Sequence, residues 1–119
     1  MHTCAPHPRH QQQEHPGADL FGGVPPALLE FAGTLAAAPV IRTRSEQGRP
    51  VPVLCVELHG VGPRGNTVHA ELPFAEEERR ATEACAAALQ PGQRVIVTTA
   101  ANTLRLNLPR ALSVAPAAE

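Results

Sequence analysis

The feature that most restricts the fold of this chain is a punctuated pattern of extended segments between Phe31 and Leu58. In the expected strand 51–59, Leu54, Val56 and Leu58 alternate with Cys55, Glu57 and His59, which is typical of a strand with one buried face. A proline interrupts the pattern at position 39, and a polar stretch ending in Gly48 interrupts it again. Short polar stretches with Gly or Pro between such runs are typical of turns. The pattern therefore predicts extended segments joined by a polar turn.

The rest of the chain adds shorter strands and one helix. The helix begins with three glutamates, which suit the positive end of its dipole, and it ends before Pro91-Gly92. The expected strands are residues 28–35 continuing through 40–44, then 51–59, 67–73, 94–99 and 104–108, with the helix at 76–89 between the third and fourth strands. This element order is that of an OB fold, a five-stranded Greek-key barrel. A barrel also hides the strand edges of so small a sheet, so the expected fold class is all-β with one helix.

The chain of 119 residues has room for one domain, and its first part differs in composition from the rest. Residues 1–25 contain four histidines and a run of three glutamines but few large apolar side chains. Such a segment buries too little apolar surface to offset the entropy of ordering it, so a disordered arm is expected there. Residues 26–115 are expected to form the barrel domain, whose small core makes its stability marginal without a partner subunit.

The basic residues of the chain are concentrated on the expected strands, although the net charge is only −1. All ten basic residues are arginine. Seven of them lie in or beside expected strands: Arg42, Arg44, Arg49, Arg64, Arg94, Arg105 and Arg110. A basic face is therefore compatible with the near-neutral total charge.

The cysteines and the apolar runs bear on the compartment. Cys4, Cys55 and Cys85 are an odd number without paired spacing, which favours free thiols in a reducing compartment. No apolar run has the length of a membrane span, and the N-terminus lacks the pattern of a signal peptide. The expected location is the cytoplasm, with no membrane partner.

Four short motifs in order carry a resemblance to a known family. The first is Gly33-x-Leu35, followed four residues later by Pro39 and then by the pair Ile41-Arg42. The other three are the hairpin glycine Gly48, the strand residues Val51, Leu54 and Val56, and the run Leu89, Gly92, Val95 and Val97. Over residues 28–108 the chain resembles the bacterial and phage single-stranded-DNA-binding proteins. Its Gly33-Thr34 and Leu72-Pro73 are also similar to primosomal replication protein N.

This resemblance implies an OB-fold protein that binds single-stranded DNA without catalysing a reaction. The setting it implies is replication or recombination, including that of a phage, plasmid or mobile element, with replication or recombination proteins as further partners. It also implies a homodimer or homotetramer with His69 at the subunit interface; the alternative for His69 is a hydrogen-bonded histidine of a strand. The third strand departs from the family pattern, because Val68 stands where the family has a stacking tryptophan.

The candidate binding residues follow from the way OB surfaces hold single strands, by arginine contacts to phosphate and by stacking of bases on aromatic rings. Phe74 is the candidate for stacking, while Phe31 is expected in the core. The arginines expected to line the groove are Arg42, Arg44, Arg49, Arg64 and Arg105. For any one of them the alternative is a solvated surface arginine.

Two other classes of function are compatible with the sequence. One is a protein–protein interaction module or structural subunit, in which an OB barrel has lost its stacking aromatics. The other is a zinc-dependent enzyme or metal carrier that uses Cys4, His7, His10 and His15, which are zinc-ligand residue types. The prolines of that segment and its lack of a surrounding core argue against a rigid site, so no metal and no cofactor are expected. No nucleophile-elbow or phosphate-cradling glycine motif is present, so an enzyme is not expected.

Overall fold

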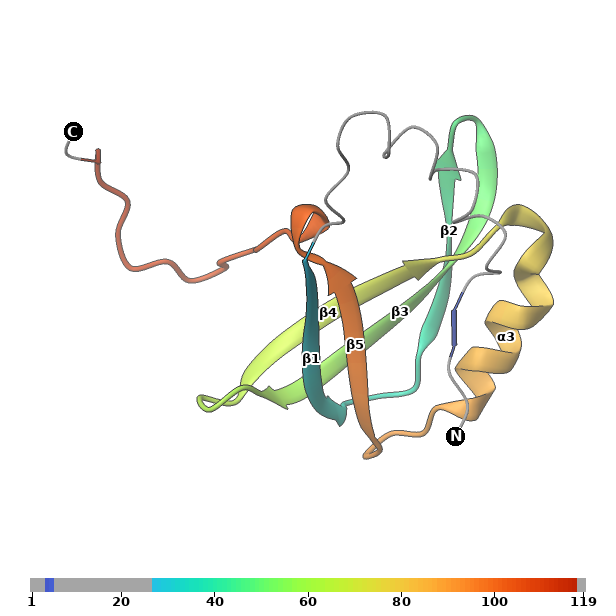
Figure 1. Ribbon diagram of the computed structural model, residues 1–119, viewed down its shortest axis with the longest axis horizontal. Helices are drawn as coiled ribbons and strands as arrows, with labels where there is room; N and C mark the ends of the chain where they lie inside the picture. Colours follow the sequence, from blue (N-terminus) through green and yellow to red (C-terminus); the bar gives the residue numbers. More distant parts are fainter. Residues whose placement is uncertain (1–3, 6–26, 118–119) are drawn as a thin grey trace.

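The computed structural model describes residues 4–5 and 27–117 of the chain (Figure 1). Its elements are, in order, β1 (Leu28–Leu35), β2 (Val40–Glu46), β3 (Arg49–Val61), β4 (Asn66–Pro73), the 3-10 turn η1 (Glu76–Glu78), α3 (Arg79–Ala88), β5 (Arg94–Ala100) and the 3-10 turn η2 (Ala101–Thr103). The expected arm, residues 1–25, lies outside the described residues except for Cys4 and Ala5. The described part of the chain is mostly β with one α-helix, as the sequence predicts.

The five strands form one antiparallel sheet built around β3. β3 pairs with β2 over residues 49–55 and with β4 over residues 53–61. β1 meets β3 only at Thr34–His59 and Leu35–Leu58, and it pairs with β5 over seven residues. The strand order is β2-β3-β1-β5, and β4 pairs only with β3 beside this path. β4 and β5 do not pair with each other, so the closed barrel expected from the sequence is not formed.

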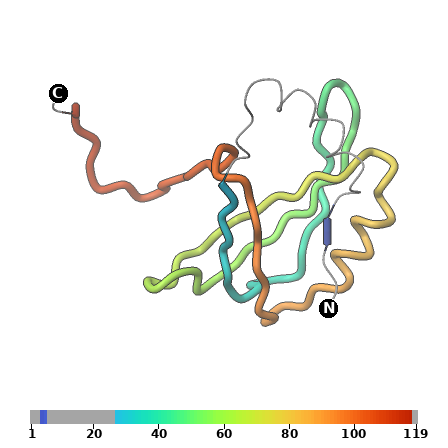
Figure 2. The backbone as a smooth tube through the Cα atoms, viewed as in Figure 1, coloured from blue at the N-terminus to red at the C-terminus, as the bar shows by residue number. Residues whose placement is uncertain are grey.

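The number of strands is confirmed, but the chain divides into strands differently from the prediction. The expected first strand is two strands, β1 and β2, because residues 36–39 separate them. Residues 104–108 belong to no strand, and Figure 2 shows this part of the chain running out from the sheet. Alternation shows that a segment suits a half-buried face, but it does not supply a partner strand. The helix therefore lies between the fourth and fifth strands rather than between the third and fourth.

Two glycines allow β1, β2 and β3 to meet as they do. A Cβ atom on Gly33 would lie 2.7 Å from Val61 Cγ2 and 2.8 Å from His59 O, so the crossing of β1 and β3 requires glycine. The sequence suggests a bulge or sharp coiling at this position, and the structure gives a close approach of two strands. The hairpin between β2 and β3 turns at Gln47-Gly48, with φ of 54° and 77°. Two residues with positive φ suit the twist of paired strands.

The core consists of two apolar clusters on the inner side of the sheet. The first contains Leu35, Leu58 and Val61, with Phe31, Val56, Val68, Leu89, Val95 and Val97 packed against it. The second contains Leu54, Phe74 and Cys85, with Cys4, Ile41, Val56, Leu72, Ala86 and Leu89 packed against it. α3 covers the second cluster, which leaves the two halves of the sheet covered to different degrees.

The buried face of α3 carries a hydroxyl and a thiol. Thr82 is fully buried, and its Oγ1 donates a hydrogen bond to Glu78 O at 2.9 Å, which satisfies the polar group within the helix. Burial raises the pKa of Cys85 from its ordinary value of 9.0 to about 12, with smaller contributions from a hydrogen bond with Cys4 and the charge of Cys4. The Cys85 thiol is therefore protonated and unreactive at neutral pH.

Candidate nucleic-acid interface

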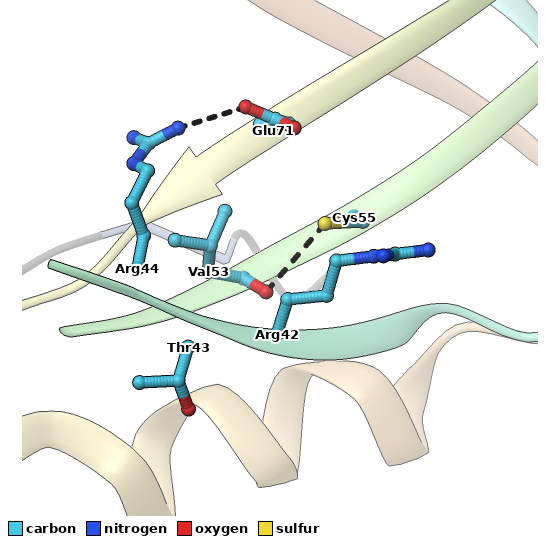
Figure 3. A pocket seen from close by; sticks show the side chains of 6 residues that line it. All are labelled: Arg42, Thr43, Arg44, Val53, Cys55 and Glu71. Atoms are coloured by element: carbon cyan, nitrogen blue, oxygen red, sulfur yellow. Dashed lines mark hydrogen bonds and ion pairs between the residues drawn. The ribbon is translucent and has the colours of Figure 1, made fainter. Parts of the chain in front are cut away.

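The face of β2, β3 and β4 that points away from α3 carries two of the predicted arginines together. Arg42 and Arg44 are alternate residues of β2, so they project on the same side of the strand. With Thr43, Val53, Cys55 and Glu71 they line a shallow hollow of about 160 Å³ (Figure 3). This face, made by the outward side chains of β2, β3 and β4, is called the outer face below.

The register of β2, β3 and β4 determines which residues lie next to one another on the outer face. Arg42 lies opposite Val53, which is 2% exposed, and Cys55 lies opposite Glu71. Figure 3 shows the two arginine side chains diverging, with Arg44 turned toward Glu71 and Arg42 extended past Cys55. The sheet therefore fixes the bases of the two side chains and leaves their guanidinium groups at the surface.

Arg44 forms ion pairs with two carboxylates, whereas Arg42 forms none with the described residues. Arg44 Nε is 2.9 Å from Glu46 Oε2, and Arg44 Nη1 is 2.8 Å from Glu71 Oε1. The side chains of Arg44 and Glu71 are 41% and 58% exposed, so solvent weakens their attraction. Arg42 is exposed and forms no ion pair with any residue in the described part of the chain. Arg42 is therefore the arginine of this hollow that is available to an incoming anion.

Arg49 lies at the end of the β2–β3 hairpin, beside the start of the helical region. Its Nη1 is 3.5 Å from Glu76 Oε1, and its side chain is 76% exposed. Nearby, Arg79 Nη2 donates to Thr43 Oγ1 at 3.2 Å, which ties α3 to the inward side of β2. Arg49 is thus close to β2 but is directed toward the helix end of the sheet.

The other two predicted arginines lie elsewhere. Arg64 is in the loop between β3 and β4, at the opposite end of β3 from Arg49. The thirteen residues of β3 separate these positions by about 40 Å at the usual rise of a strand. Arg105 lies in the exposed segment after η2. The structure therefore brings Arg42 and Arg44 together, with Arg49 near them, and separates Arg64 and Arg105.

Phe74 does not lie on the surface. Its side chain is 3% exposed and packs with Leu54 and Cys85 beneath α3. The backbone N–H of Phe74 donates to Pro52 O at 2.9 Å, which fixes the chain just past the end of β4. The prediction of a stacking role for Phe74 is corrected by this burial. Strand alternation stops at Pro73, so the sequence held no signal for the direction of the next side chain.

A second polar group on the outer face was not predicted as a unit. His59 Nε2 is 2.8 Å from Glu57 Oε2, and His69 Nδ1 is 3.9 Å from Glu57 Oε1. His69 lies directly opposite Glu57 in the register of β3 and β4, and its side chain is 74% exposed. The alternation of β3 indicates that Glu57 and His59 share a face, whereas pairing with His69 requires the register. Contact of His69 with another subunit stays a prediction.

The charges of the outer face nearly cancel. Arg42, Arg44 and Arg49 are matched in number by Glu46, Glu57 and Glu71. Electrostatic attraction of a nucleic-acid strand to this face is therefore local to Arg42 and its neighbour, and it is not the field of a basic stripe.

No protein-family model, curated protein or solved structure matches this chain.

The described residues were also compared with the requirements of a metal site and of a membrane-spanning helix. Residues 4–5 and 27–117 contain no group of three or more His, Cys, Asp and Glu side chains placed to hold a metal ion. Of the zinc-ligand residue types in the N-terminal segment, Cys4 is described, while His7, His10 and His15 lie outside the described residues. Within the same ranges, no helix has the length and apolar character to cross a membrane.

Proposed function

We propose that this chain binds single-stranded DNA through the outer face and does so without catalysing a reaction. The observation that carries the proposal is the placement of Arg42 and Arg44 on one face of β2, beside a common hollow. Alternate residues of a strand are about 7 Å apart, so the two guanidinium groups are spaced to engage different phosphates of an extended strand. The proposed setting is DNA replication or recombination in the cytoplasm, in a cell, phage, plasmid or mobile element.

The order of the elements supports an OB-like topology for this proposal. β1 and β2 both pair with β3, so together they act as one bent first strand, followed by β3, β4, α3 and β5. This is the order of the first four strands and the helix of an OB fold, with residues 104–108 in the place of its fifth strand. Single-stranded nucleic acids are bound on OB surfaces by cationic side chains and aromatic rings. We infer that the outer face is the equivalent surface here.

The surroundings of Arg42 and Arg44 limit the affinity for single-stranded DNA that we propose. No aromatic side chain lines the hollow at Arg42 and Arg44, so base stacking, worth about 1–3 kcal/mol per base, is missing there. Glu71 competes with phosphate for Arg44, although an exposed ion pair is worth only about 0–1 kcal/mol and is easily exchanged. Binding through two phosphates would give a slope of about −1.4 for log K against log salt. We therefore expect weak binding that is lost as salt is raised.

The test is fluorescence anisotropy with a labelled oligothymidine at low salt, repeated at higher salt. Arg42→Ala should weaken binding about three- to tenfold, because it removes the unpaired cation. Glu71→Gln should strengthen binding about two- to fivefold, because it frees Arg44 from a competing carboxylate. Arg110→Ala, which makes the same charge change in the exposed C-terminal segment, is the matched control and should have a smaller effect. Flat anisotropy with the parent chain at micromolar concentration would refute the proposal.

A second candidate is an interaction module or structural subunit with little DNA affinity. It is favoured by the exposed apolar side chains of the described residues. Five of the eight large ones follow η2: Leu104, Leu106, Leu108, Leu112 and Val114. Exposed apolar surface of this kind marks interaction sites. Under this candidate the chain assembles as a homodimer or homotetramer, and Arg42→Ala and Glu71→Gln leave its assembly unchanged.

A further inference from the structure

Cys4 lies against the core beneath α3. It packs on the second core cluster, whose buried members are Leu54, Phe74 and Cys85. A hydrogen bond joins the thiols of Cys4 and Cys85. In Figure 1 the described residues 4–5, drawn in dark blue, run beside α3. The fold therefore brings two thiols into contact, although one lies near the start of the chain and the other in its helix.

The third cysteine lies on the other side of the sheet. Cys55 lines the hollow of the outer face, and its Sγ donates to Val53 O at 3.8 Å. Its neighbour in β3, Leu54, belongs to the cluster that contains Cys85. Successive side chains of a strand point to opposite faces, so β3 separates Cys55 from the other two thiols. Cys55 therefore serves as a control for them.

The two thiols in contact differ in their access to solvent. Cys85 is 5% exposed, whereas Cys4 is half-buried and belongs to no helix or strand. Burial keeps Cys85 protonated at neutral pH, because it raises the pKa of that thiol to about 12. The thiolate is the attacking species in thiol–disulfide exchange. Cys4 is therefore the thiol that an oxidant contacts first, and Cys85 is placed to react second.

We propose that Cys4 and Cys85 form a disulfide within one chain when the protein meets a small-molecule disulfide such as glutathione disulfide. The Cys4 thiolate attacks one sulfur of that molecule, which leaves a mixed disulfide on Cys4 and releases one glutathione thiolate. Cys85 then loses its proton and attacks the sulfur of Cys4, which releases the second glutathione thiolate. Two protein thiols are oxidised and one glutathione disulfide is reduced, and the two released thiolates take up the two protons.

The bond would fasten the start of the chain to α3. Two thiols that are already in contact need only a small displacement to reach the sulfur–sulfur distance of about 2.05 Å. A crosslink between positions 4 and 85 also closes a long loop in the unfolded chain, and the resulting stabilisation grows with loop length. Oxidation should therefore stabilise the fold. It should leave the outer face unchanged, so the proposal does not depend on DNA binding.

The first test maps the bond by mass spectrometry after the full chain is incubated with excess glutathione disulfide and digested with trypsin without reduction. The expected product is peptide 1–9 joined to peptide 81–94, from protein that has lost two hydrogen atoms. Cys55→Ser should give the same product, whereas Cys85→Ala should stop at the mixed disulfide on Cys4. Cys4→Ser, at a half-buried position, should give neither product, so the test does not rely on a substitution in the core. A bond to Cys55, a bond between chains, or glutathione retained on Cys4 in the parent chain would overturn the proposal.

The second test measures the rate and the effect of oxidation. Conversion of the mixed disulfide to the protein disulfide should accelerate about tenfold per pH unit between about pH 7 and pH 9, because Cys85 attacks only as the thiolate. The oxidised protein should melt at least about 10 °C above the same protein in a reducing agent. Cys4→Ser should melt at the same temperature under both conditions. An oxidised parent chain that melts at or below the reduced one would show that the bond distorts the fold, which contradicts the placement of the two thiols.

Discussion

The two halves of the sheet use the same alternating pattern but are completed to different degrees. In the half formed by β2, β3 and β4, β3 has a partner strand on both edges, and α3 covers the inner side. In the half formed by β1 and β5, β1 touches β3 at only two residue pairs, and a hollow opens beside its free edge. The difference indicates that the core is covered where the central strand has a partner on each edge. Alternation of apolar and polar residues is not enough to cover it.

The largest expected contrast is between the phenylalanines of the two halves. Phe74→Ala should lower the free energy of unfolding by about 3–5 kcal/mol, because it leaves a cavity in the closed cluster beneath α3. Phe31→Ala should cost about half as much, because Phe31 borders the hollow and is only partly buried. Urea unfolding of both variants measures the difference. Equal losses would mean that the β1–β5 half is closed in solution.

The next effect concerns the point where the two halves meet. Gly33→Ala should destabilise the fold by about 1–3 kcal/mol, since the new Cβ would lie 2.7 Å from Val61 Cγ2 and 2.8 Å from a backbone oxygen. The neighbouring substitution Ala32→Val is the control, because Ala32 is exposed and its change should be close to neutral. Thermal unfolding separates the two variants. A neutral Gly33→Ala would show that β1 and β3 are farther apart than described here.

The free energy of unfolding should depend on pH through Cys85, which lies in the half formed by β2, β3 and β4. The pKa of Cys85 is raised to about 12 in the folded protein, and an unfolded thiol ionises near its ordinary value of 9.0. The native state therefore keeps a proton that the unfolded state releases, so this contribution is complete below pH 9 and is lost as the pH rises toward 12. The slope approaches about 1.4 kcal/mol per pH unit. Denaturant unfolding between pH 8 and pH 11 should show it, and the same series with Cys85→Ala should lack it.

The smallest effect is expected on the outer face. Arg44→Gln removes two ion pairs whose side chains are all more than 40% exposed, so the free energy of unfolding should change by less than about 1 kcal/mol. The change should shrink further in high salt, because screening already weakens these pairs. A loss of several kcal/mol would mean that the outer face contributes to the core. Its assignment as a binding surface would then need to be abandoned.

Much of the fold follows from the order of residues along the chain. The periodicity of residues 51–59 predicts β3, and Gly48 predicts the hairpin before it; both are confirmed. Pro91-Gly92 predicts the end of the helical region, which the structure places just before it. The division of residues 28–44 into β1 and β2 was missed, because a proline can mark either a kink in one strand or a break between two.

The candidate site was less predictable than the fold. Arg42 and Arg44 share a face because strand geometry places alternate residues on one side, and this could be read from the sequence. Arg64 and Arg105 could not be excluded in the same way, since their distance from β2 depends on the length of β3 and on the exit of the chain from η2. The pairing of Arg44 with Glu71 also could not be predicted, because Glu71 is 27 residues away in the sequence.

Local chemistry was enough to place β3, β4, β5, the hairpin turn and the helix of this protein, because backbone conformation and side-chain alternation depend on neighbouring residues. Long-range packing alone established that Phe74 points into the core, that the sheet stays open beside β1, and that the leucines after η2 have no strand to cover. The physical reason is that burial and strand pairing require surfaces supplied by distant parts of the chain. The local pattern indicates whether a residue suits a buried or an exposed position, and the assembled sheet determines which residues it contacts.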